Sequence, residues 1–423
     1  MRPAAPGPLI LAGAIALASA LGLASCSETG AGPTAIWTDA PELALAVELF
    51  NSSQDRYLVE LEWKAGLAEA VRQAKEPPGL VVGRYLKNQG VRERLRSLDY
   101  LFGELVVNQS SFYPGLLALG NVEGRQMLLP VSFNLPAIAF ARDAAPVGDG
   151  FLLGLADMAP AASAFNRRAG GGFSRMGFSP RWDPAFLVLA ANAAGAGFKE
   201  GKPLAWNEKG LAAGVEALRA WTVSTNGSAA QEDEFQFKYL YTPGYQYLSS
   251  GRALFAYVDS SAFFTIPDDK RASLDYRWFA SRGGLPLSDD LVYAAIPRSG
   301  AGRPAAEAFL KWLFREDSQD ALLERSRRTR AIERSFGVVG GFSSIRAVNE
   351  RILPLYYPSL VGHLPPADAL MSPNVLPGDW PELKSAVVAP WLAEATARAA
   401  PAANPGEELA ARVAEYRKHL AQR

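Results

Sequence analysis

The chain has 423 residues, 49% of them hydrophobic, and its 43 basic side chains balance 43 acidic ones. This balance argues against a polyanion such as nucleic acid as the main partner, because proteins that bind polyanions carry a basic excess or stripe. A chain of this length exceeds what one hydrophobic core usually holds, so two domains are expected. The single cysteine excludes a framework of internal disulfides, and stability must come from burial in the core.

The first 26 residues have the pattern of a secretory leader. Arg2 precedes an apolar run over 9–23, which is as long as a signal-peptide core and shorter than the ~20 residues of a membrane-spanning helix. Small residues then lead to Cys26, an arrangement that resembles the bacterial lipobox. We expect residues 1–25 to be removed and Cys26 to carry lipid at the new N-terminus; an ordinary secretion signal with an incidental cysteine is the alternative. Residues 26–33 are small and polar and would form a flexible tether.

The next segment alternates between predicted strands and helices. Residues 35–37 and 80–82 are short apolar strands, and residues 57–64 alternate between apolar and polar side chains as a half-buried strand does. Apolar residues at helical spacing over 43–50 and a helical stretch at 67–75 separate these strands. The order β-α-β-α-β predicts a parallel α/β sheet.

The rest of the chain is less regular and richer in aromatic residues. Prolines mark the stretch that follows Leu129 as extended, because they disfavour a helix there. We predict extended segments at 131–140, 253–258 and 292–296. Helices are predicted at 182–194, at 305–314 and from Asn404 to the C-terminus.

The sequence lacks the groups of residues that several kinds of chemistry require. His363 and His419 are isolated, so a zinc site or a histidine-based catalytic triad is not expected, and no metal or cofactor is predicted. The acid pairs at 268–269 and 289–290 lie among turn-forming residues and are expected to be solvated loop acids, with a carboxylate pair or a calcium site as the alternative. An arginine-rich run over 325–334 is interleaved with glutamates and is expected to be a solvated helix face.

Aromatic side chains beside small polar groups are the residues that recognise sugars. Flat rings pack against the apolar faces of a pyranose, and carboxylates, amides and guanidinium groups satisfy its hydroxyls. Trp37 and Asp39 follow the first strand and Arg84 follows the third, where open α/β sheets bind ligands. Trp182 lies at a helix entrance. Core packing of Trp37 and a plain surface position for Arg84 are the alternatives.

Four stretches in this order resemble the bacterial extracellular solute-binding proteins of family 1, the receptors of ABC importers that include the maltose binders. These stretches are Ile36-Trp37-Thr38-Asp39, the segment from Leu129 to Pro136, the segment from Gly251 to Tyr257, and Ala294 to Ser299 leading into the helix from Ala305 to Leu313. The resemblance covers nearly the whole chain after the leader. Where sugar binders of the family often carry Gly-Gly-Pro-Trp, this chain reads Val258-Asp259-Ser260-Ser261, which removes one stacking tryptophan.

The resemblance implies a two-lobe periplasmic-binding-protein fold of class II, with a ligand cleft between two discontinuous α/β lobes. Lobe I would comprise residues 34–135 and 286–330, and lobe II residues 136–285 and 331–423. Matching the family position by position gives a set of expected ligand contacts: Trp37, Asp39, Arg84, Asn134, Trp182, Asp259 and Ser260.

We therefore expect a lipid-anchored receptor of the cell envelope, extracytoplasmic or periplasmic, that is monomeric and not an enzyme. It would bind a small solute, most readily a carbohydrate, close by a hinge that includes residues 132–136, and deliver the solute to the transmembrane subunits of an ABC permease. A ligand-sensing or adhesive lipoprotein that reuses the fold is the main alternative. A secreted carbohydrate-active enzyme is the other, and Asp39 and Asp259 would be its only candidate carboxylates.

Overall fold

The computed structural model describes residues 32–103, 107–144, 150–202 and 204–422. Every helix and strand among the described residues lies in the part of the chain that begins at Pro33. The predicted leader and its lipidation site, Cys26, lie outside the described residues. Within the described ranges, no helix combines the length and apolar character needed to cross a membrane.

The first sheet has six strands and is built around the predicted β-α-β-α-β unit. Its strands are ordered β17-β6-β16-β3-β1-β2. The prediction of parallel pairing is confirmed for β1 with both of its neighbours, β2 and β3. It is wrong for the sheet as a whole, because β16 runs antiparallel between β3 and β6. The bounds are β1 Thr34–Thr38, β2 Val59–Trp63, β3 Leu80–Gly83, β6 Leu129–Phe133, β16 Val292–Ala295 and β17 Phe342–Ser343.

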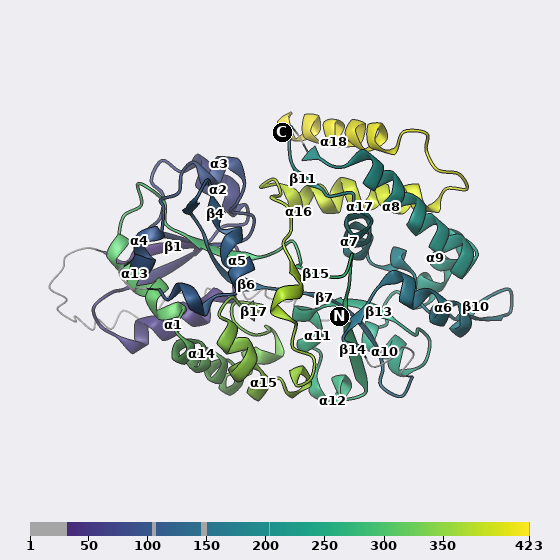
Figure 1. The fold of residues 1–423 in the computed structure, drawn as a ribbon, viewed down its shortest axis with the longest axis horizontal. Helices are drawn as coiled ribbons and strands as arrows, with labels where there is room; N and C mark the ends of the chain where they lie inside the picture. The colour runs from purple at the N-terminus through teal and green to yellow at the C-terminus, as the bar shows by residue number, and fades with distance from the viewer. Residues whose placement is uncertain (1–31, 104–106, 145–149, 203, 423) are drawn as a thin grey trace, which may run out of the picture. The chain divides into compact units, whose positions relative to one another are not determined.

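Amphipathic helices cover this sheet through their apolar sides. In α1 (Leu43–Ser53), Phe50 is buried and meets Phe309 of α13 (Arg303–Leu313) edge to face, with ring centroids 5.3 Å apart. The next helix, α14 (Glu316–Arg328), lies beside α1 (Figure 1). Its arginine-rich end is a solvated face as predicted, because Arg327 and Arg328 pair with Glu324 on the surface.

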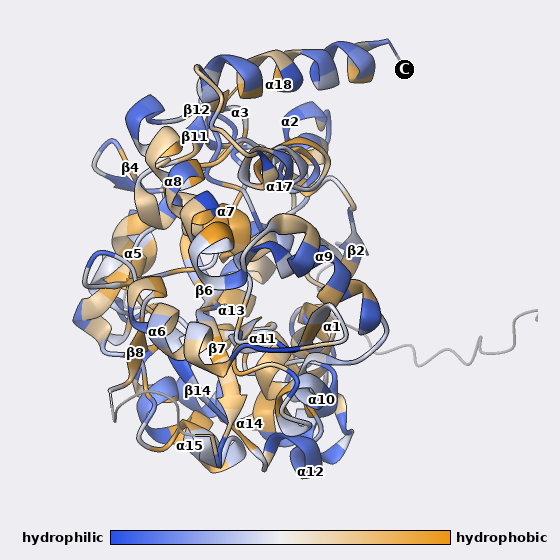
Figure 2. Ribbon diagram, turned by 90° about the vertical axis from the view of Figure 1, so that its right-hand side faces the viewer, coloured by the Kyte–Doolittle hydropathy of each residue, from blue (hydrophilic) through white to orange (hydrophobic). Residues whose placement is uncertain are grey.

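The second sheet has four strands in the order β13-β7-β14-β8. The bounds are β7 Pro136–Ala141, β8 Leu152–Leu153, β13 Ala256–Asp259 and β14 Leu274–Phe279. A largely apolar helix, α7 (Pro184–Ala194), packs against α8 (Glu208–Trp221) and α17 (Ala389–Ala397), and Figure 2 shows its hydrophobic character. Gly195 ends α7 in a left-handed conformation, φ 112°, which a residue with a Cβ rarely adopts.

The chain passes between the two sheets at Asn134 and Leu135. β6 ends at Phe133 in the first sheet and β7 begins at Pro136 in the second, so only these two residues separate them. A return passage over 287–291 follows β15 (Leu285–Pro286), which pairs in parallel with β18 (Leu370–Met371). The crossing predicted at 132–136 is therefore a direct link between the sheets.

The segment after α14 belongs to the first sheet by its pairing. β17 pairs with β6, and Phe336 stacks on Phe264 at 4.5 Å between ring centroids. Phe342 lies against both Phe133 and Trp278, so this aromatic cluster joins residues of the two sheets. The lobe boundary proposed at residue 330 assigns these residues to lobe II, although their strand lies in the first sheet.

The remaining elements cover the sheets or connect them. They are α2 Leu67–Gln73, α3 Gln89–Arg92, α4 Asp99–Gly103, α5 Pro114–Leu119, β4 Asn121–Val122, β5 Arg125–Gln126, α6 Leu155–Phe165, β9 Arg167–Ala169, β10 Gly172–Arg175, β11 Lys199–Glu200, β12 Leu204–Ala205, α9 Ala229–Lys238, α10 Gly244–Ser249, α11 Ser260–Phe264, α12 Asp268–Arg271, α15 Leu353–Tyr356, α16 Trp380–Leu383 and α18 Pro405–Ala421.

Candidate ligand-binding site

The first sheet contributes Asp39 and Arg84 to the site, at the carboxyl ends of β1 and β3. The backbone N–H of Arg84 donates to Asp39 Oδ1 at 3.0 Å, and Arg84 Nη1 donates back to the Asp39 carbonyl at 2.9 Å. Burial raises the pKa of the Asp39 carboxyl, while the N–H and the charge of Arg84 act in the opposite direction. The two predicted contacts are thus neighbours, as expected from adjacent parallel strands.

Tyr85 follows Arg84 in a strained backbone conformation. Its φ is 57°, in the left-handed region that side chains with a Cβ avoid. Burial raises the pKa of its hydroxyl well above the ordinary value, and the charges of Asp289 and Asp290 raise it further. Strain that persists at a polar cluster is typical of functional sites. No sequence pattern marked this tyrosine as a candidate contact.

Asn134 and Ser260 meet at the crossing between the sheets. Ser260 Oγ donates to Asn134 Oδ1 at 2.7 Å and accepts from the backbone N–H of Leu135 at 3.1 Å. Asn134 Nδ2 donates to the carbonyl of Gly340 at 3.0 Å. Both predicted residues are buried and hydrogen-bonded to each other, and they hold the crossing in place.

The second sheet contributes Asp259 at the end of β13, and α7 contributes Asp183. Each carboxylate caps a helix: Asp259 accepts from the N–H of Ala262 at 2.8 Å, and Asp183 from the N–H of Ala185 at 2.8 Å. Burial raises the pKa of the Asp183 carboxyl, and the charge of Asp259 adds to the effect, so the two carboxylates lie near each other. Tyr257 lies between the same charges: burial raises the pKa of its hydroxyl well above the ordinary value, and Asp259 and Asp183 raise it further.

Asp289 and Asp290 are not the solvated loop acids that the sequence predicted. Asp289 accepts hydrogen bonds from Trp380 Nε1 at 2.6 Å and from Lys384 Nζ at 2.8 Å. Burial, then the charge of Asp289, raise the pKa of Asp290 to about 6. The prediction failed because the return passage between the sheets is packed between elements distant in sequence, which a local turn composition does not reveal.

Two cavities flank this pair of aspartates. The larger, about 290 Å³, is lined by apolar residues of α7 and by Tyr257, Asp289 and Lys384. The smaller, about 140 Å³, is lined by Glu42, Arg84, Asn134 and Asp290. Among the described residues, Asp290 Oδ1 and Glu42 Oε2 are buried carboxylate oxygens with no hydrogen-bond donor. Buried oxygens in this state are expected to receive donors from a ligand or from water.

The two predicted tryptophans lie outside the lining of these two cavities. Trp37 is half-buried, and Lys64 Nζ lies 4.5 Å from its ring centroid. Trp182 stacks on Phe235 with ring centroids 5.4 Å apart, and its Nε1 donates to the carbonyl of Glu232 at 3.3 Å. The aromatic residues that line the cavities were not among the predicted contacts; they are Phe198, Tyr257 and Phe336.

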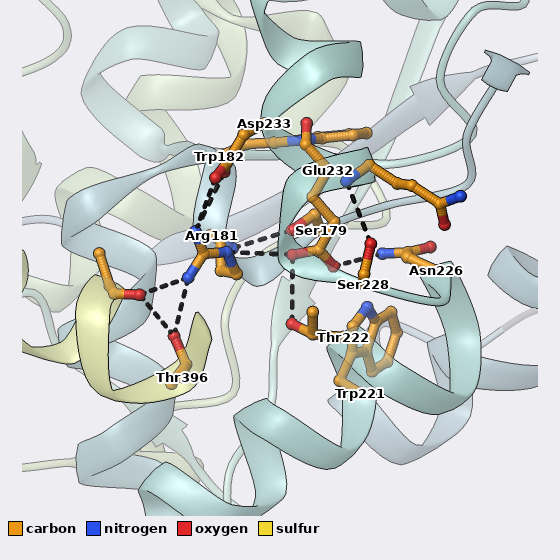
Figure 3. A network of polar contacts seen from close by, with 12 residues as sticks. Ser179, Arg181, Trp182, Trp221, Thr222, Asn226, Ser228, Glu232, Asp233 and Thr396 are labelled. Carbon is orange, nitrogen blue, oxygen red and sulfur yellow. Dashed lines mark hydrogen bonds and ion pairs between the residues drawn. The ribbon is translucent and has the colours of Figure 1, made fainter. Parts of the chain in front are cut away.

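A buried network behind Trp182 holds its segment in place (Figure 3). Glu232 is fully buried, pairs with Arg181 Nε at 3.1 Å and accepts from Asn226 Nδ2 at 2.7 Å. Arg181 also donates to Thr396 of α17 at 3.2 Å. Burial raises the pKa of Glu232 to about 7, although these donors and the charge of Arg181 lower it.

The site is suited to binding a polar, uncharged molecule. Carboxylates accept hydroxyl donors, Arg84 and Lys384 donate, and the tyrosine rings offer apolar faces. In the part of the chain that the structure describes, no three His, Asp or Glu side chains are grouped to bind a metal ion.

Solved structures with the same arrangement of elements bind oligosaccharides. An ABC substrate-binding protein of Listeria monocytogenes, in complex with cycloalternan, superposes with a TM-score of 0.63 over 92% of this chain and 99% of that one. The chain has the fold of the ABC substrate-binding proteins. The maltose-bound MalE3 of T. maritima matches it at a TM-score of 0.59 over 92% of this chain and 99% of that one.

A third structure with this substrate-binding-protein fold is the maltose-maltodextrin binding protein of Alicyclobacillus acidocaldarius, with a TM-score of 0.57 over 90% of this chain and 100% of that one. Sequence identity to the three is 11%, 13% and 14%. No protein-family model and no curated protein sequence matches the chain. The two-lobe α/β class predicted from the sequence is confirmed.

Proposed function

We propose that the protein is a lipid-anchored, extracytoplasmic receptor of an ABC importer that binds a carbohydrate between its two lobes and closes on it by a hinge. The observation that carries the proposal is the meeting of polar groups from both sheets and from the return passage around Asp290. A ligand there would touch the residues after β1 and β3 on one side and those after β13 on the other.

The positions of these groups support hinge closure. A ligand that contacts both lobes binds the closed state more tightly than the open one, and this difference in affinity is what a population shift requires. The short crossing at Asn134 and Leu135 and the paired strands β15 and β18 restrict the motion to bending about one axis. The lipid anchor at Cys26, which rests on the sequence pattern alone, would keep the receptor at the membrane that holds the permease.

The hydrogen bonds that the two candidate carboxylates already accept favour binding over hydrolysis. Asp39 is engaged by the N–H of Arg84 and Asp259 by the N–H of Ala262, so both act as acceptors in structural bonds. A glycosidase needs one carboxyl as proton donor and a second as base or nucleophile. Incubation with oligosaccharides followed by chromatography would reveal an enzyme by its products.

The test is direct binding to the chain from Ser27 to Arg423, which contains every described element. We expect an oligosaccharide such as maltotriose or mannotriose to raise the melting temperature, because a ligand that binds only the folded state stabilises it. Calorimetry should then show weaker binding by Asp290→Asn and unchanged binding by the surface control Asp317→Asn on α14.

The pH dependence of binding adds a second readout. Because the pKa of Asp290 is raised to about 6, its carboxylate is charged and accepts ligand hydroxyls fully above that pH. Affinity should fall as the pH drops through 6, and the fall should be shallower in Asp290→Asn. The pH dependence that remains in this variant would come from Asp39 and Asp183, because burial raises their pKa values as well. Sugars that bind with the same affinity in wild type and Asp290→Asn at pH 8 would move the site elsewhere.

A further inference from the structure

One corner of the molecule gathers arginines that have no acidic partner. Arg167 and Arg168 of β9 and Arg175 of β10 lie on one hairpin, and Arg252 donates to the carbonyl of Ser174 in the same hairpin at 3.4 Å. Among the described residues, none of these four arginines forms an ion pair with a carboxylate. On the arginine-rich helix α14 the opposite holds, since Arg325, Arg327 and Arg328 all pair with glutamates. Lys238 of the adjoining helix lies beside them but pairs with Glu234 at 2.8 Å, so the uncompensated charge is that of the arginines. The four arginines and Lys238 are called the basic corner below.

The guanidinium groups are held in position and still have donors to offer. Arg168 lies over the ring of Phe173 at 4.3 Å and donates once, to Gln231 of α9 at 2.9 Å. Arg175 lies over the ring of Phe165 at 4.6 Å. Arg167 Nη1 donates to the carbonyls of Ala164 and Asn166, and Arg175 Nε is buried. A guanidinium carries five N–H donors, so each of these side chains keeps further donors for anions, and phosphate oxygens match their geometry.

Exposed apolar side chains border the basic corner. Phe237, Leu240 and Tyr241 are 76%, 56% and 94% exposed, and they occupy the end of α9 and the turn after it. α9 packs on β10, and a Cβ placed on Gly172 of the hairpin would lie 2.8 Å from Glu234 Oε1 and 3.0 Å from Lys238 Nζ, so the hairpin and the end of α9 are in contact. Figure 2 presents α9 and α10 toward the viewer.

We propose that the basic corner and its apolar border bind the surface of an anionic membrane. Such binding combines buried apolar area with attraction between basic side chains and acidic headgroups. The features form a protruding hairpin and helix end, which suits insertion between headgroups, whereas the carboxylate-rich cavities of the ligand site suit a small solute. The contact is independent of the proposed carbohydrate site and would orient the receptor on the membrane.

The test is cosedimentation of the chain from Ser27 to Arg423, which lacks any lipid anchor, with vesicles. We expect binding to vesicles of phosphatidylglycerol and phosphatidylcholine in equal parts, little binding to pure phosphatidylcholine, and weaker binding as salt is raised. Changing Arg167, Arg168 and Arg252 to Gln together should weaken binding about a hundred-fold, since each basic residue near the surface contributes a factor of about five.

A matched triple variant on α14, with Arg325, Arg327 and Arg328 changed to Gln, should bind like wild type. Phe237→Ser with Tyr241→Ser, two highly exposed positions, should weaken binding without lowering the melting temperature, which separates membrane contact from folding. The proposal is overturned if wild type does not sediment with anionic vesicles at low salt, if it binds neutral vesicles equally well, or if the two triple variants lose binding equally.

Discussion

The buried carboxyl of Glu232 makes a quantitative prediction about stability and pH. Its pKa is raised from 4.5 to about 7 in the folded protein, whereas an exposed glutamate in the unfolded chain keeps the ordinary value. The folded state therefore holds a proton that the unfolded state releases between these two values. Because the folded-state pKa is the higher one, this contribution is present at low pH and is lost as the pH rises through 7.

The size of the effect follows from the shift. Each pKa unit corresponds to 1.36 kcal/mol, so the full loss is about 3 kcal/mol, and about 2.5 kcal/mol of it falls between pH 5 and pH 8. Glu232→Gln removes the titrating group while keeping donors and acceptors of similar shape. We expect the free energy of unfolding of this variant, relative to wild type, to rise by about 2 kcal/mol over that range.

Urea unfolding of the chain from Ser27 to Arg423 at pH 5, 6, 7 and 8 measures this difference. The matched control is Glu234→Gln, two residues further along α9, where the exposed carboxylate only pairs with Lys238 and the change should stay within about 0.5 kcal/mol at every pH. A pH-independent difference between Glu232→Gln and wild type would refute the reasoning and place the charged, Arg181-paired form at all four pH values.

Two further changes test strain and the crossing between the sheets. At the left-handed position of Tyr85, Tyr85→Gly should be more stable than Tyr85→Ala by about 1 kcal/mol in thermal or urea unfolding, the reverse of the usual order, because only glycine accepts this φ without strain; equal stabilities would contradict that strain. Ser260→Ala leaves Asn134 Oδ1 and the N–H of Leu135 without their partner in a buried place, so it should lower the unfolding free energy by about 1–3 kcal/mol, whereas the exposed Ser224→Ala should change it little.

The first half of the first sheet could be predicted because its signals are local. Periods of two and of 3.6 residues, with prolines and glycines between them, mark β1 to β3 and their helices within one or two residues of their bounds. The predicted helices at 182–194 and 305–314 hold for the same reason: Asp183 caps α7, and α13 has a proline in its first turn and an apolar face.

What failed depends on contacts between distant segments. Nothing within 292–296 indicates that this strand pairs antiparallel with β3, some two hundred residues earlier in the sequence. The Asp289–Asp290 pair has the composition of a solvated turn, and Asp289 is bonded and partly buried because Trp380 and Lys384 come from another part of the chain. From its sequence context Glu232 would be an ordinary acid on a helix surface. It is buried because the segment that contains Arg181 packs against it.

The candidate site was predicted in part. Asp39 with Arg84, and Asn134 with Ser260, are brought together as pairs, since strand ends and chain crossings place them. Tyr85, Tyr257 and Asp290 were missed because a single tyrosine or aspartate after a strand has many roles and only the surrounding charges distinguish this one. Whether the predicted residues contact a ligand remains a prediction for the binding experiments above.

The position of β16 has a consequence for biogenesis. This strand fills the gap between β3 and β6, so the first sheet cannot close before residue 295 has left the ribosome, whatever helices have formed by then. Pairings over such sequence distances form slowly, since the intervening loop must be closed first. A nascent chain of this topology thus stays open for most of its synthesis, which is the state that export through a secretion channel, as proposed for this protein, would require.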